Sequence, residues 1–72
     1  MIDLTKLKVK TITYSHGEYQ LGSPVDIVDE GSFYRIDGTH ILDKYKIKEI
    51  RESDGKVEIE MTGKLVVLET LR

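Results

Sequence analysis

Apolar and polar residues alternate most regularly in the last third of the chain. Residues 57–62, VEIEMT, place an apolar side chain at every second position, which is the pattern of a strand with one buried face. Asp54-Gly55, just before this strand, is a residue pair that tight hairpin turns favour. Gly63 predicts a second reversal, into the continuous apolar run of residues 65–68. Such a run is typical of a strand covered on both faces. The pattern therefore predicts three consecutive antiparallel strands, the first of them ending before Asp54.

The register of the first hairpin requires one extra residue. Continued unchanged from the turn, the register sets Ile47 against Thr62 and wastes an apolar side chain. If Lys48 and Glu49 together face one residue of the partner strand, as a β-bulge, Ile47 meets Met61 instead. We therefore predict a bulge at these two residues.

The segment between Gly38 and Gly55 allows a competing interpretation. Residues 43–53 contain good helix formers, several at helical offsets, so a short helix is the alternative to a strand. Residues 39–44 can hold one helical turn or the start of a long, bent strand. We favour a strand up to Ser53 and keep a short helical turn near 39–44 as an open alternative.

The first part of the chain predicts a second hairpin. Across residues 6–14 the apolar side chains change parity after Lys10, which predicts a bulge within one strand. Residues 15–17 form a turn, and residues 18–21 alternate as a returning strand. We expect Gly22-Ser23-Pro24 to break that strand, because proline has no amide hydrogen to give to a ladder.

Two further strands follow the expected break. Residues 25–28 run to a turn at 29–32, and residues 33–36 run back to a second Asp-Gly pair at 37–38. Short strands at regular spacing with glycine turns predict a single all-β domain over residues 1–72. Its fold is expected to be a small antiparallel meander barrel or sandwich of five to six strands. In shape such a domain is similar to the SH3-like and Sm-like small barrels, although no motif identifies a family.

The size of the chain limits the core that these strands can bury. A chain of 72 residues without cysteine lies near the size at which one core seldom stabilises a fold comfortably, and it has no disulfide to help. Barrel closure, self-association or a partner remain as supplements. The predicted core residues are Leu7, Val9, Ile12, Val25, Ile27, Phe33, Ile36, Ile47, Ile50, Val57, Ile59, Leu65 and Val67.

Charge and composition narrow the functional classes. The chain has 11 basic and 13 acidic residues, a formal net charge of −2, which argues against a strong non-specific grip on nucleic acid. Without cysteine, thiolate metal sites and thiol catalysis are excluded. No apolar run approaches the length of a membrane span, and the acidic start is unlike a signal peptide, so we expect a cytoplasmic location.

The titratable residues show no catalytic motif. His16 and His40 are the only histidines, and neither has a second histidine at metal-ligand spacing. An acid–base or metal site would need Asp26, Asp37 or Asp43 to converge on them in space. No phosphate-binding glycine loop, nucleophile elbow or dinucleotide fingerprint is present. We therefore predict that the protein is not an enzyme and has no cofactor and no metal site.

Tyrosines supply the first candidate recognition surface. Phe33 and Tyr34 are adjacent and cannot both point into the core of a regular strand. Tyrosine combines a large apolar area with a polar tip and is enriched at interfaces. We predict that Tyr34 and Tyr45 contribute to a surface that binds a partner protein.

A strand edge supplies the second candidate surface. Residues 65–71 place apolar side chains on both parities, and a monomeric core can take only one of them. Unless Ile2 and Leu4 cover them, Val66 and Leu68 leave an apolar stripe beside an unpaired edge. We therefore predict a protein-interaction or regulatory module that binds an unknown partner, or a second copy of itself, through this edge.

The alternative function is a nucleic-acid-binding small β-barrel. Aromatic side chains can stack on bases while basic side chains contact phosphate. The row of Lys6, Lys8 and Lys10 would instead complement Glu58 and Glu60 if the first strand lay beside residues 57–61. The basic residues that carry this alternative are Lys6, Lys8, Lys10, Arg35, Lys44, Lys46 and Lys48.

Overall fold

The computed structural model describes residues 3–71 and is all-β. Seven antiparallel strands form one sheet in the order β4-β3-β2-β1-β7-β6-β5, and this sheet does not close. The strands are β1 (Lys8–Tyr14), β2 (Gly17–Asp29), β3 (Phe33–Ile36), β4 (His40–Asp43), β5 (Ile47–Ser53), β6 (Lys56–Met61) and β7 (Lys64–Thr70). Two short 3₁₀ turns, η1 (Leu4–Lys6) and η2 (Lys44–Lys46), complete the described elements. None of the helical segments in residues 3–71 is long and apolar enough to cross a membrane.

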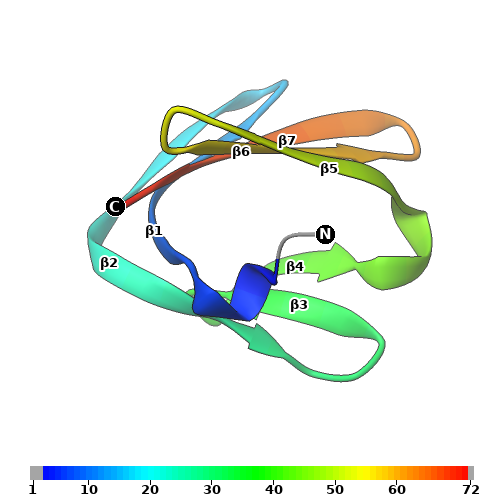
Figure 1. The fold of residues 1–72 in the computed structure, drawn as a ribbon, viewed down its shortest axis with the longest axis horizontal. Helices are drawn as coiled ribbons and strands as arrows, with labels where there is room; N and C mark the ends of the chain where they lie inside the picture. The colour runs from blue at the N-terminus through cyan, green and yellow to red at the C-terminus, as the bar shows by residue number, and fades with distance from the viewer. Residues whose placement is uncertain (1–2, 72) are drawn as a thin grey trace.

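The sheet curls around its core. In Figure 1, β5, β6 and β7 lie above β3 and β4, and β1 and β2 join the two layers at one side. On the opposite side the chain passes from β4 to β5 through η2. No ladder joins β4 to β5 within residues 3–71, so both are edge strands.

The strand count of seven corrects the expected five to six. The segment 40–53 holds two strands because a 3₁₀ turn interrupts it: the carboxylate of Asp43 accepts a hydrogen bond from the Tyr45 amide at 3.0 Å. The helical turn therefore lies at Lys44–Lys46 rather than at 39–44, where β4 runs instead. The strand interpretation of residues 47–53 is confirmed, and a helix over 43–53 is wrong.

Both Asp-Gly turns form as the sequence predicts. Asp37 and Gly38 have φ angles of 52° and 72°, and Asp54 and Gly55 have 51° and 77°. Around Asp54-Gly55, Ser53 pairs with Lys56, so these two residues form the two-residue loop of a type I′ turn, whose twist matches that of the flanking strands. Around Asp37-Gly38, Ile36 pairs with His40, so the loop has three residues, and the Thr39 amide donates to the Asp37 carbonyl at 2.7 Å. Aspartate and glycine tolerate positive φ better than other residues, which explains why both hairpins carry this pair.

The two predicted bulges are present. On β5 the register shifts between Ile47, which pairs with Met61, and Glu49, which pairs with Glu60. On β1 it shifts between Val9 and Thr11 in the ladders to both neighbours. Each extra residue returns the apolar side chains of its strand to the inner face.

Proline does not end β2, contrary to expectation. The strand runs through Pro24 from Gly17 to Asp29. Its ladder to β1 nevertheless skips residues 21–24, because Thr11 pairs with Gln20 and Val9 pairs with Val25. The proline thus lies where β2 has no ladder partner, and its missing amide hydrogen costs no ladder bond.

Most of the predicted core lies inside the curled sheet. Six predicted residues are fully buried: Val9, Ile12, Ile27, Ile36, Val57 and Ile59. Four are half-buried and pack against this core: Leu7, Val25, Ile47 and Ile50. Phe33 and Val67 are half-buried but do not belong to the core cluster, and Val67 pairs with Glu58 on the outer face. Leu65 is 43% exposed and is not a core residue. The core residues that the sequence reasoning missed are Leu4, Leu42, Met61, Val66 and Leu68.

The prediction that Val66 and Leu68 form an exposed stripe is wrong. Both side chains are buried, with exposed fractions of 0%. Residues directly opposite in an antiparallel ladder point to the same face, and Val66 and Leu68 pair with Ile59 and Val57, the inward residues of β6. β7 also pairs with β1, so it is an inner strand and offers no free edge.

The N-terminal segment contributes to this core. Leu4 in η1 is 1% exposed and belongs to the same buried cluster as Val66 and Leu68. The side chain of Asp3 caps η1 by accepting a hydrogen bond from the Thr5 amide at 3.0 Å. Leu4 thus lies in the same core as Val66 and Leu68, while Ile2 lies outside the described residues.

Candidate functional site

The open side of the sheet carries a depression beside the β5 edge. It has a volume of about 460 Å³. One wall comes from β3 and η2, and the other comes from the first residues of β5. We call this feature the seam; its lining residues are Tyr34, Lys44, Ile47, Lys48, Glu49 and Ile50.

The floor of the seam is apolar. Ile47 and Ile50 are half-buried and pack against the core from β5, and Tyr34 does so from β3. The bulge between Ile47 and Glu49 explains why two isoleucines three positions apart both face inward. The seam therefore combines a partly covered apolar surface with an edge strand that has no second partner in the described chain.

An ion pair fixes the position of Lys44 at the rim. Its Nζ donates to Asp29 Oδ1 at 2.7 Å and lies 4.7 Å from the centre of the Tyr34 ring. The hydrogen bond from Lys44, followed by one from the Gly31 amide, lowers the pKa of Asp29. The same bond raises the pKa of Lys44. The rim therefore holds Tyr34 and Lys44 in one arrangement.

Exposed side chains surround the seam. Tyr45, on η2, is 87% exposed, the highest value among the large apolar side chains of residues 3–71. Lys46 and Lys48 are also exposed and form no ion pair with any described residue. Of the four predicted interaction residues, Tyr34 lines the seam and Tyr45 is exposed on η2, whereas Val66 and Leu68 lie in the core.

Several predicted nucleic-acid residues are engaged in ion pairs. Lys44 binds Asp29 at the seam. The Arg35 Nε is enclosed and lies 3.2 Å from Glu30 Oε2 without the alignment of a hydrogen bond. The pairs on β1 are Lys8–Asp26 at 2.8 Å and Lys10–Glu69 at 3.9 Å. Lys6, Lys46 and Lys48 form no ion pair within residues 3–71.

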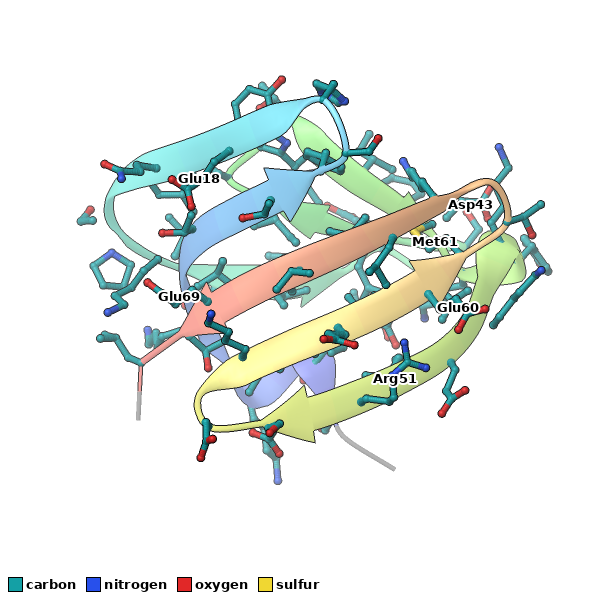
Figure 2. The ribbon with its side chains drawn as sticks, turned by 90° about the horizontal axis from the view of Figure 1, so that it is seen from above. Glu18, Asp43, Arg51, Glu60, Met61 and Glu69 are labelled. Carbon is teal, nitrogen blue, oxygen red and sulfur yellow. The ribbon has the colours of Figure 1, made fainter. Side chains whose placement is uncertain are left out.

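The row of lysines on β1 does not face Glu58 and Glu60, because β7 lies between β1 and β6. The two glutamates flank Arg51 instead, and Figure 2 shows Arg51 on β5 turned toward Glu60 on β6. Arg51 is 3.3 Å from Glu58 and Glu60 and 3.1 Å from Glu49. Hydrogen bonds to these carboxylates, that to Glu60 first, raise the pKa of Arg51. The outer face of β5 and β6 is thus an ordinary charged surface.

The two histidines meet at a second depression. His16 and His40 lie around Tyr14 and Tyr19, in a depression of about 380 Å³. Asp26, Asp37 and Asp43 do not line it. Residues 3–71 contain no group of three or more histidine, cysteine, aspartate or glutamate residues arranged to hold a metal ion. Sequence spacing gave no signal for this meeting, because it joins the tip of one hairpin to the start of β4.

Comparison with known proteins adds no identification. No family model matches the chain, and neither the curated proteins nor the solved structures contain a significant match.

Proposed function

We propose that the protein is a non-enzymatic protein-interaction module that binds an extended segment of a partner protein at the seam. The observation that carries this proposal is that the unpaired edge strand β5 borders an apolar depression that Tyr34 also lines. Edge strands bind extended segments through main-chain hydrogen bonds, while neighbouring pockets select side chains. The absence of cysteine fits a reducing cytoplasmic setting, which forms part of the proposal.

The partner segment would complete the sheet. β4 and β5 are the two edges, and η2 connects them along the chain. A strand added to β5 would pair the free side of that strand and cover Ile47 and Ile50. With the seam filled, the curled sheet would approach a closed small barrel, similar in shape to SH3-like and Sm-like domains. This shape is part of the proposal.

Charge indicates the composition of the partner segment. Lys48 lines the seam, and Lys46 directly precedes the seam residue Ile47 at the end of η2. Neither lysine has an acidic partner among residues 3–71, and Glu49 lies 3.1 Å from Arg51. An incoming strand with acidic residues facing these lysines and apolar residues facing the isoleucines would be complementary. We therefore propose an acidic, alternating apolar segment as the ligand.

The test compares two pairs of lysine reversals. Binding proteins are captured from a nuclease-treated lysate with the wild-type chain, identified, and titrated by calorimetry against both double variants. Lys46→Glu/Lys48→Glu is expected to weaken binding by at least roughly tenfold, because it opposes like charges. The control, Lys6→Glu/Lys10→Glu, makes the same change of charge away from the seam. Equal affinities of the two double variants would refute binding at the seam.

The same titration discriminates the remaining ligands. A nucleic-acid ligand would be lost on nuclease treatment and would show a steep fall of affinity with salt. Self-association through β5 would appear as a concentration-dependent increase of mass in sedimentation. Chemical shifts of the amides of residues 47–53 report directly whether a strand has been added there.

A further inference from the structure

The second depression lies away from the seam and has its own chemistry. It is formed by the tip of the β1–β2 hairpin, the start of β4 and the start of β7. The ionisable and aromatic side chains that line it are Tyr14, His16, Tyr19, His40 and Lys64. We propose that this depression binds a small anion that carries a tetrahedral oxyanion group, such as the phosphate of a small molecule.

The imidazoles are held in place by the tyrosines. The Tyr14 hydroxyl and His40 Nδ1 are 3.1 Å apart, and so are His16 Nε2 and the Tyr19 hydroxyl. Within residues 3–71 the second ring nitrogen of each imidazole forms no hydrogen bond. A protonated imidazole donates from both nitrogens, so each histidine has one donor left for a ligand.

Ring stacking adds further order to this arrangement. The Tyr14 ring stacks with His16 at 5.3 Å and 9° between planes, and with His40 at 5.8 Å and 22°. Tyr19 meets His40 at 5.0 Å and Tyr14 edge-on at 5.7 Å. Aromatic pairs at these separations are favourable. The four rings thus form a preorganised group, which reduces the entropy lost when a ligand binds.

The charge of the depression is one-sided. Lys64 Nζ lies 5.4 Å from the centre of the Tyr14 ring and forms no ion pair with any described residue. No aspartate or glutamate lines the depression, although the chain as a whole has a net charge of −2. Ser15 and Thr39 add hydroxyl groups. Ammonium, imidazole and hydroxyl donors without an opposing carboxylate favour an anionic ligand.

The titratable groups that face the ligand are Tyr14 from β1, His16 from the turn, Tyr19 from β2, His40 from β4 and Lys64 from β7. Burial raises the pKa of Tyr14, so its hydroxyl stays protonated across the neutral range. A neutral phenol places no negative charge beside a bound anion.

Sulfate is the probe, because it is a tetrahedral oxyanion that keeps its double charge at neutral pH. Histidine side-chain and backbone chemical shifts are followed during titration with sodium sulfate against sodium chloride of equal ionic strength. We expect saturable shifts at His16, His40 and Lys64 with sulfate and none with chloride. Inorganic phosphate and acetate then separate a tetrahedral anion from a carboxylate.

Two substitutions test the residues involved. Lys64→Gln and His16→Gln change exposed side chains, and each is expected to weaken sulfate binding by about tenfold. The control Lys10→Gln removes an equal charge outside the depression and should leave binding unchanged. Shifts that never saturate, or that all three variants share, would overturn the proposal. The seam variant Lys46→Glu/Lys48→Glu should keep the sulfate response, so failure at one depression is distinguishable from failure at the other.

Discussion

Truncation of one leucine in β7 tests the inward face of that strand. Leu68 is fully buried and lies in register with Ile12 of β1 and Val57 of β6. Leu68→Ala removes its side chain beyond Cβ from the middle of the core. Buried leucine-to-alanine changes cost about 2–5 kcal/mol, depending on how far the cavity collapses. Domains of this length have a free energy of unfolding of about 4–11 kcal/mol, at the usual ~0.05–0.15 kcal/mol per residue.

The matched control is Leu65→Ala in the same strand. Leu65 is 43% exposed, and burying a whole leucine contributes only about 1.5–3 kcal/mol, so its truncation should cost on the order of 1 kcal/mol. Urea unfolding followed by far-UV circular dichroism measures both variants at unchanged m-value. If Leu65→Ala destabilised the protein more than Leu68→Ala, the inward face of β7 would be the opposite one and the register with β6 would be wrong.

Two further predictions concern a turn and an ion pair. Gly38→Ala should destabilise the protein by about 1–2 kcal/mol, because the residue has a φ of 72° although no atom crowds its Cβ position; Gly22→Ala, at an equally open site without positive φ, should be nearly neutral in urea unfolding. In the folded protein the pKa of Asp29 lies below its ordinary value of 3.8, so the ionised carboxylate stabilises the folded state at pH values above 3.8. This stabilisation is lost as the pH falls through the lower pKa of the folded state. Asp29→Asn should therefore flatten the loss of stability below about pH 4, and an unchanged acid profile would contradict the ion pair with Lys44.

Local chemistry made the turns and bulges predictable. Both Asp-Gly pairs mark a chain reversal through their tolerance of positive φ, and the bulge before Glu49 follows from matching apolar residues across one hairpin. The inward face of β7 was mispredicted because residues 65–68 are apolar on both parities. A two-residue turn at Thr62-Gly63 places Met61 opposite Lys64 and hence Val66 opposite Ile59. The register of this hairpin therefore determines which face of β7 points inward, whereas the composition of residues 65–68 does not.

The two depressions were less accessible to sequence reasoning. The sequence favours Tyr34 and Tyr45 as recognition residues. It also favours a free edge at β7, which is wrong, because the pairing of β7 with β1 is a long-range contact that the local pattern does not reveal. The meeting of His16 with His40 depends on how β2 and β3 place β4 beside the β1–β2 hairpin. No spacing along the chain reports such an arrangement, whereas the hydrogen bonds to Tyr14 and Tyr19 show it directly.

The ladder between β1 and β7 affects how the chain can fold during its synthesis on the ribosome. Thr13 pairs with Val67 and Val9 pairs with Thr70, so β1 must wait until β7 has been synthesised before its second edge is covered. During that interval Ile12 lacks Leu68, its partner in register. Nascent chains that stall before β7 is complete would therefore expose an unpaired edge of β1 together with apolar side chains. Such chains would be prone to aggregation and would need chaperones.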